Sequence, residues 1–216
     1  TKMTKAEAEK RLTNIADNLP TPSAGVNPGK GEIEHDIKAI AYDMQGFIDQ
    51  CVERYCELAK VGKDTLKPVP TPSLDDHQID PKELEDEGRL GTEAAKILMK
   101  TLYCARLLRF DLLWTLCKLA RCVTKWTKAC DRRLHRLMSY LQTSRDVTLE
   151  AFCGDEADKL SLMVYADADF AGDIVSSKST SGAYLALVGK NTFIPLGSFS
   201  NKQAVVSHSN TESEIV

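Results

Sequence analysis

The feature that most constrains the fold is a change in the spacing of apolar residues near residue 145. Between about residues 37 and 145, apolar side chains recur at steps of three and four, which is the period of an amphipathic helix. Beyond Arg145, β-branched and aromatic residues gather in short runs bounded by Gly, Asp, Ser and Lys. The sequence therefore predicts an α/β protein, with helices first and then an antiparallel strand meander that ends in a helix.

The helical part is expected to start after a charged helix and a Pro/Gly/Ser linker, which together occupy residues 1–36. Further helices are predicted over residues 37–61, 92–108, 111–123 and 128–142, with Gly62, Thr92 and Asp111 as cap residues. Residues 67–81 hold four prolines and are expected to be extended. We place a boundary there, which separates residues 37–72 from residues 73–145.

The strands are predicted in four runs, "VTLEAF", "LSLMVYADA", "SGAYLALVG" and "TFIPLGSFS", with "GKN" at 189–191 as a tight hairpin turn. A helix is expected to follow at "HSNTESEIV". Ser209 and Glu212 fit a capping box, in which the glutamate reaches back to the cap backbone. Glu214 lies about 200° further around this helix than Glu212 and is expected to point elsewhere.

Asp167 stands where an apolar strand ends, and a carboxylate is costly to bury there unless something compensates it. Asp167 and Glu214 can face each other across a sheet–helix interface. Paired carboxylates of this kind suit Mg²⁺, or Mn²⁺, but they also occur as caps or as solvated groups, and spacing alone leaves both interpretations open. Asp169 is expected to be a turn residue and Asp173 to cap a Gly-Asp turn.

Two charged blocks oppose each other in sign within a chain of net charge −3. Residues 75–93 hold eight acids and two bases, and residues 112–145 hold eight bases and one acid. The basic helix residues either follow a phosphate backbone or form a solvated face; these are Lys128, Arg132, Arg133 and Arg136. A second polar group either contacts nucleic acid or forms the rim of a hairpin; it comprises Lys178, Ser179, Thr180, Ser181, Lys202 and Gln203.

The seven cysteines contain no CxxC pair, so we expect reduced core thiols and no zinc site. Such thiols indicate a reducing compartment, and a cytoplasmic protein is predicted, with a virus-like particle or the nucleus as alternatives. No stretch approaches the ~20 apolar residues of a membrane span, so no membrane partner is expected. We also expect no small-molecule ligand. Both ends of the chain look cut, which predicts a fragment of a longer polypeptide.

Several motifs occur in the order found in one family. They are "YADADFAGD" at 165–173, "KSTSGAY" at 178–184, "SNKQ" at 200–203 and "SNTESEI" at 209–215. This segment resembles the ribonuclease H region of copia-type retrotransposon Pol polyproteins, whose patterns read Y-x-D-A-D-W-A-G-D, K-S-T-S-G-Y, S-x-K-Q and S-S-T-E-A-E-Y. Residues 73–145 are similar to the connection helices of that family, and residues 37–72 look like the end of its reverse transcriptase thumb.

The resemblance implies that residues 146–216 form the first part of a ribonuclease H-like domain, with Asp167 and Glu214 as its first two metal ligands. The implied reaction is hydrolysis of the RNA strand of an RNA/DNA hybrid with two Mg²⁺ ions, and the implied partners are that hybrid and the rest of the Pol polyprotein. The family uses two more carboxylates beyond Glu214, and its polymerase Y-x-D-D motif is absent here. We therefore expect an inactive fragment; the alternative is a non-catalytic nucleic-acid-binding remnant of a transposable element.

Overall fold

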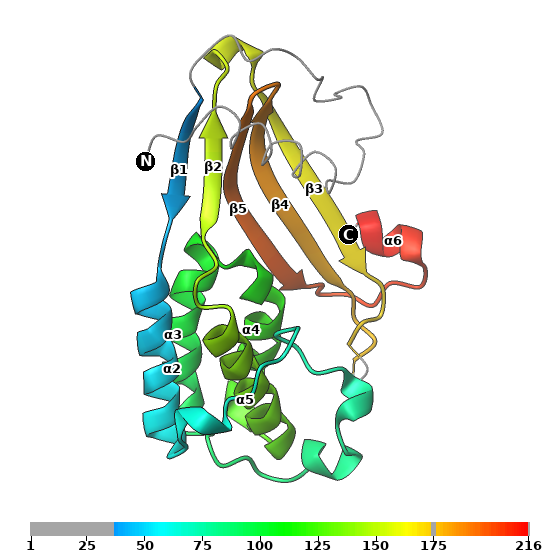
Figure 1. Ribbon diagram of the computed structural model, residues 1–216. Helices are drawn as coiled ribbons and strands as arrows, with labels where there is room; N and C mark the ends of the chain where they lie inside the picture. The colour runs from blue at the N-terminus through cyan, green and yellow to red at the C-terminus, as the bar shows by residue number, and fades with distance from the viewer. Residues whose placement is uncertain (1–36, 174–175, 216) are drawn as a thin grey trace. The chain divides into compact units, whose positions relative to one another are not determined.

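The computed structural model describes residues 37–173 and 176–215, which form a mixed α/β protein with four larger helices and one antiparallel sheet (Figure 1). The chain divides into two compact units. The first contains β1, with residues Leu149–Ala166 and Ala183–Gly197 of the sheet region. The second contains Asp43–Thr148, which holds the larger helices, together with the described parts of 167–182 and 198–216.

The larger helices are α2 (Gln45–Ala59), α3 (Ala94–Leu107), α4 (Leu113–Ala120) and α5 (Lys128–Thr143). They share one hydrophobic cluster, in which Ile48, Leu98 and Leu134 are fully buried. In α5 the buried residues recur at helical steps, as the sequence predicts, so one face of this amphipathic helix lies in the core. Because α2 belongs to the same cluster, residues 37–72 and 73–145 build a single core on both sides of the proline-rich segment.

The prediction of one helix over residues 37–61 is wrong at its start. Residues Lys38–Tyr42 form strand β1, and the backbone of Ile40 pairs with that of Ala151 in strand β2 (Leu149–Cys153). The local apolar spacing was ambiguous, and a partner strand distant in sequence decides the conformation. The helix that follows ends at Ala59, and its C-cap is Lys60 rather than the predicted Gly62; Lys60 adopts a left-handed conformation with φ 53°.

Two predicted N-caps are also wrong. Thr92 does not cap α3, because Glu93 occupies the cap position and makes no side-chain cap hydrogen bond. Asp111 does not cap α4. Its carboxylate instead accepts hydrogen bonds from Arg109 Nη2 at 2.8 Å and from the Tyr140 hydroxyl at 3.0 Å. Both carboxylate oxygens of Asp111 are thus engaged by the buried Arg109 guanidinium, which leaves the start of α4 uncapped.

The five-stranded sheet has the order β1-β2-β5-β4-β3 (Figure 1). Strands β3 (Ser161–Asp169), β4 (Thr180–Gly189) and β5 (Thr192–Lys202) form a meander, which confirms the predicted strands and the hairpin turn after Gly189. Asp155 fixes this turn, because its Oδ2 accepts a hydrogen bond from the Asn191 backbone at 2.6 Å. Strand β2 joins β5 where Phe152 faces Phe193. This order makes β3 an edge strand.

Candidate functional site

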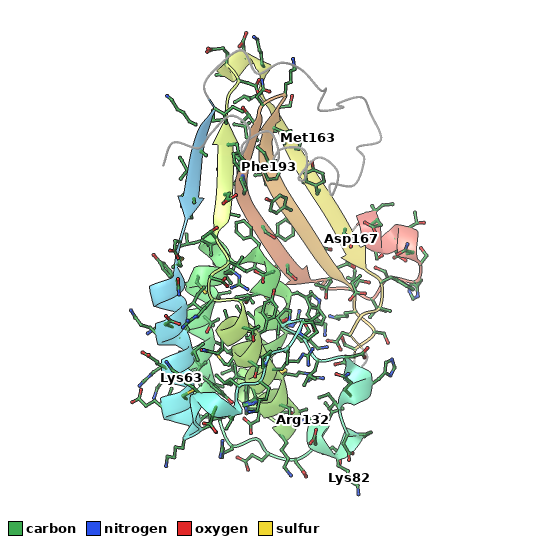
Figure 2. All side chains as sticks on the ribbon, in the orientation of Figure 1. Lys63, Lys82, Arg132, Met163, Asp167 and Phe193 are labelled. Atoms are coloured by element: carbon green, nitrogen blue, oxygen red, sulfur yellow. The ribbon has the colours of Figure 1, made fainter. Side chains whose placement is uncertain are left out.

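The candidate site lies where β3 ends, and Figure 2 labels Asp167 there. Alternation along the strand leaves Asp167 exposed and turns the following Ala168 inward, where it is buried. Within residues 37–173 and 176–215, the Asp167 carboxylate has no hydrogen-bond or ion-pair partner. The neighbouring strand carries Gly182 opposite it, and a Cβ there would lie 3.9 Å from the Asp167 carbonyl oxygen. Asp167 therefore presents a free carboxylate on an edge strand.

The second predicted ligand, Glu214, lies on helix α6 (Asn210–Ile215). The Ser209 hydroxyl accepts a hydrogen bond from the Glu212 backbone at 3.1 Å, and Glu212 Oε2 accepts one from the His208 backbone at 2.8 Å. This is the predicted capping arrangement, except that Glu212 accepts from the backbone N–H of His208 instead of that of Ser209. Glu212 thus has a structural role, whereas Glu214 is exposed and has no partner in the described part of the chain.

Gln203 ties α6 to the sheet. Its side-chain nitrogen donates to the Ser181 hydroxyl on β4 at 2.9 Å and to the Ser213 carbonyl of α6 at 2.6 Å. Its side-chain oxygen accepts from the Ser207 hydroxyl at 3.2 Å. Since Ser181 precedes Gly182 and Ser213 precedes Glu214, this one buried amide brings the backbones that carry Asp167 and Glu214 to the same end of the sheet.

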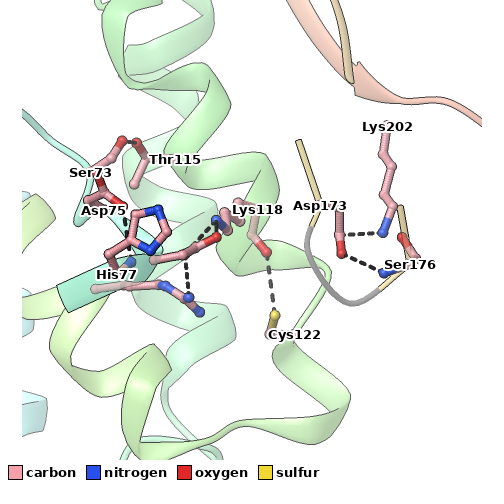
Figure 3. Close-up of polar contacts among 11 residues, drawn as sticks. Ser73, Asp75, His77, Thr115, Lys118, Cys122, Asp173, Ser176 and Lys202 are labelled. Carbon is pink, nitrogen blue, oxygen red and sulfur yellow. Dashed lines mark hydrogen bonds and ion pairs between the residues drawn. The ribbon is translucent and has the colours of Figure 1, made fainter. Parts of the chain in front are cut away.

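The loop after β3 is closed by internal contacts. The Asp173 carboxylate forms an ion pair with Lys202 and accepts a hydrogen bond from the Ser176 backbone at 3.0 Å (Figure 3). Asp173 is therefore a turn residue, as predicted, and it also binds a lysine of β5. Asp169 packs over Gly172, where a Cβ would lie 1.9 Å from Asp169 Oδ2, so its carboxylate also lies against the loop.

The polar residues predicted to contact nucleic acid near this loop are used inside the molecule. Lys178 Nζ donates to the Ala204 carbonyl, and Ser179 Oγ accepts from the Ala171 backbone at 3.1 Å. Ser179 is fully buried and Thr180 nearly so. The remaining three are engaged in the same way: Ser181 and Gln203 in the α6 contact and Lys202 in the ion pair with Asp173. The geometry assigns this cluster a structural role, because strand ends and loops close on it.

The basic face of α5 pairs in part with the acidic segment. Arg132 pairs with Glu83 at 2.6 Å and Lys128 with Asp86 at 3.3 Å. Arg136 donates to the carbonyl and hydroxyl oxygens of Thr71 at 3.1 and 2.9 Å. The sequence located both charged blocks, but it could not show that one folds onto the other.

Asp76 is the most enclosed of these acids. Lys118 Nζ lies 2.9 Å from both of its carboxylate oxygens, and Arg133 Nη2 lies 2.7 Å from Oδ1. Burial alone would raise the pKa of Asp76, but the hydrogen bonds and charges of Lys118 and Arg133 outweigh it and hold the pKa below its usual value. The negative charge of Asp76 is therefore part of the folded structure.

The chemistry open to the Asp167 end follows from its donors. Two exposed carboxylates without internal partners offer hard oxygen ligands, as Mg²⁺ and Mn²⁺ require. Among the residues that the structure describes, no cluster of three or more His, Cys, Asp or Glu side chains is arranged to hold a metal ion. The assignment of Asp167 and Glu214 as metal ligands therefore stays a prediction.

In the described residues, no helix has the length and apolar character needed to cross a membrane. All seven cysteines are free thiols.

Comparison with known proteins gives one informative similarity. The chain is 37% identical over 93 residues to the protein named Secreted RxLR effector protein 161 of Plasmopara viticola. The match covers 43% of this chain, which spans 57% of the length of that relative. No family profile and no solved structure matches the chain. The expectation of a cytoplasmic, particle-associated or nuclear protein is contradicted, because the similar protein is a secreted one; free thiols alone do not identify the compartment.

Proposed function

We propose that this chain is a fragment of a copia-type retrotransposon Pol polyprotein and that the end of β3 supplies the first two carboxylates of a ribonuclease H site. In this proposal Asp167 and Glu214 hold Mg²⁺, and the substrate of the parent protein is an RNA/DNA hybrid. The connection helices correspond to α3, α4 and α5. The proposal rests on the motif order in the sequence and on one structural observation about the carboxylates at the end of β3.

That observation is the contrast between these two carboxylates and their neighbours. Glu212 caps a helix, Asp173 pairs with Lys202 and Asp169 packs on the loop, whereas Asp167 and Glu214 have no internal function in the described chain. Gln203 nevertheless holds the two elements that carry them at one end of the sheet. An antiparallel meander followed by a helix supports a ribonuclease H-like assignment for this part of the fold.

The residues suit the implied metal in kind. Asp167 and Glu214 are oxygen donors, and their exposure leaves room for metal-bound waters and a phosphate group. When bound in pairs, such metals activate a water and stabilise the leaving oxygen in phosphodiester cleavage. This chain contributes two carboxylates where the family resemblance implies four, so we expect weak metal binding and no hydrolysis by this chain alone.

Manganese binding tests the proposal directly. Water-proton relaxation of Mn²⁺ should report a weak site in the unaltered chain, and Asp167→Asn or Glu214→Gln should abolish it. Asp169→Asn is the matched control, since it removes an exposed carboxylate two residues away on the same strand and should leave the site intact. Equal binding by all four proteins would refute the assignment of Asp167 and Glu214.

Hydrolysis of a labelled RNA/DNA hybrid in Mg²⁺ tests the expected inactivity. Cleavage that disappears in Asp167→Asn would support the nuclease and contradict the expectation that the fragment is inactive. Absence of cleavage together with Mn²⁺ binding would support both parts of the proposal.

The comparison favours a second candidate, in which this chain is a secreted effector like the relative it resembles. Mass spectrometry of medium and cells from the source organism would separate the two. A secreted protein should be enriched in the medium, whereas a component of a Pol polyprotein should occur with peptides of the rest of that polyprotein.

A further inference from the structure

A pocket of about 500 Å³ opens beside helices α2 and α5, and its lining includes none of the residues described at the end of β3. Its lining comes from α2, from α5 and from the segment that joins α2 to α3. This volume lies in the range of small-molecule sites, which are about 300–1,000 Å³. Val61, Val69 and Leu74 give the pocket an apolar wall.

The charges around the pocket are predominantly positive. Lys67, Arg89, Arg132 and Arg136 line it, against the single carboxylate of Asp131. That carboxylate is already used, because it accepts hydrogen bonds from the backbones of Arg89 at 2.6 Å and Leu90 at 3.2 Å, and from Trp126 Nε1 at 2.7 Å. The cationic side chains of the lining therefore outnumber the one carboxylate, and that carboxylate already binds backbone and indole N–H groups of the protein.

The cations are positioned but not saturated. Arg89 Nη2 donates to the Ala59 carbonyl at 2.9 Å, and Arg136 holds Thr71 through Nε and Nη2. These contacts use some of the five donors of each guanidinium and fix its plane. Lys67 is exposed and has no ion pair within the described residues. Preorganised guanidinium groups with donors left over suit a doubly charged oxyanion.

The pocket also holds a hydroxyl and an imidazole group in contact with each other. The Tyr55 hydroxyl and His135 Nδ1 lie 2.8 Å apart, and His135 Nε2 lies 3.3 Å from the Thr65 carbonyl. Since a carbonyl only accepts, His135 Nε2 is the donor in the second of these contacts. Burial raises the pKa of Tyr55 to about 12, so this hydroxyl keeps its proton. Ser139 also lines the pocket and is only 3% exposed.

We propose that this pocket binds a small organic phosphate, a phosphomonoester whose phosphate lies among Lys67, Arg89 and Arg136 and whose apolar or aromatic body lies on the valine and leucine wall. The site is separate from the carboxylates at the end of β3 and does not depend on the nuclease proposal. It departs from the sequence-based expectation of no small-molecule ligand, which stays a prediction.

Isothermal titration with adenosine 5′-monophosphate tests this proposal, with adenosine and inorganic phosphate as the two half-ligands. We expect saturable binding of the monophosphate with a Kd below about 1 mM, and much weaker binding of either half. Lys67→Gln should weaken binding roughly five- to tenfold by removing one charge contact. Lys125→Gln is the matched control, because Lys125 is also exposed and has no ion pair in the described chain, but does not line the pocket.

Three results would overturn the proposal. Equal weakening by Lys67→Gln and Lys125→Gln would show diffuse attraction rather than a site. Inorganic phosphate binding as tightly as the monophosphate would remove the role of the apolar wall. Binding of a single-stranded oligonucleotide, but not of the monophosphate, with the same dependence on Lys67 would assign the pocket to a nucleic acid. Arg136→Gln should weaken binding of the monophosphate more than Lys67→Gln does. If the Arg136→Gln protein does not fold, Lys67→Gln still tests the site.

Discussion

Charged side chains have different roles around helices α2–α5 and at the Asp167 end of the sheet. Around the helices, the acidic segment pairs with basic residues, and the Asp76 carboxylate binds both Lys118 and Arg133. At the end of β3, Lys202 forms an ion pair with Asp173, and Gln203 donates a hydrogen bond to Ser213. Asp167 and Glu214 have no such partner within the described residues. A high density of charged residues therefore does not by itself identify a binding surface. A charged side chain without a partner, next to charged side chains that are all paired, is the better indicator of such a surface.

The largest expected effect is at Arg109, whose side chain is 1% exposed. Its guanidinium binds the Asp111 carboxylate and both the carbonyl and the hydroxyl oxygen of Ser144. Arg109→Met should lower the free energy of unfolding by about 3–5 kcal/mol, because it breaks a buried charged network. Urea denaturation measures this. Arg106→Met is the control on exposed α3 surface and should change stability by less than about 0.5 kcal/mol.

The next effect concerns Asp76 and has a definite pH dependence. Because its pKa is lowered in the folded state, its contribution is fully present above the unfolded pKa and is lost as pH falls through the folded pKa. Asp76→Asn should cost about 1–3 kcal/mol at pH 7, since Lys118 and Arg133 lose their partner. The stability difference between the two proteins should shrink as the solution is acidified below pH 4. A difference that is constant with pH would contradict the pairing.

A smaller and local effect is expected at Gln203. Gln203→Leu removes the hydrogen bonds to Ser181 and Ser213, and should cost about 1–2 kcal/mol. Hydrogen exchange should show the loss in α6 first, with the α2–α5 core protected as before. A uniform loss of protection would mean that the amide does more than attach this helix. Asn201→Leu is the matched control, because Asn201 is an exposed residue of β5 close to Gln203 in the sequence.

The smallest effect sharpens the comparison most. Asp167→Asn and Glu214→Gln should each change the free energy of unfolding by less than about 0.5 kcal/mol, because neither carboxylate has a partner in the described chain. Thermal denaturation without added metal measures this. If either substitution lowers the free energy of unfolding by more than about 1 kcal/mol, that carboxylate stabilises the fold, as those of Asp76 and Asp173 do.

Periodicity predicted the long amphipathic α5 and the β3–β5 meander well, because each pattern extends over many residues of one type of spacing. It failed at β1, where pairing with β2 determines the conformation, and at the caps of α3 and α4, where Asp111 is recruited by Arg109. These outcomes depend on partners distant in the sequence, which local propensity does not contain.

The candidate site was predictable only in part. The Ser209–Glu212 cap follows from helix geometry and is confirmed. The roles of Asp167 and Glu214 as metal ligands came from the family resemblance and stay predictions. The role of Gln203 and the pairing of α5 with the acidic segment do not follow from the sequence, because both need the tertiary fold. The pocket was not predicted at all, since its lining combines α2, α5 and an irregular segment between them. Of its cations, only Arg132 and Arg136 belong to the basic block of residues 112–145, whereas Lys67 and Arg89 lie outside it.

The pairing of α5 with the acidic segment has a consequence for competition. A tethered partner is present at an effective concentration in the millimolar range for short flexible linkers. Lys128 and Arg132 stay 60% and 45% exposed, so an external polyanion can reach them, but it competes with Asp86 and Glu83 for the same ammonium and guanidinium groups. The acidic segment thus acts as an internal competitor that weakens the attraction of α5 for other anions.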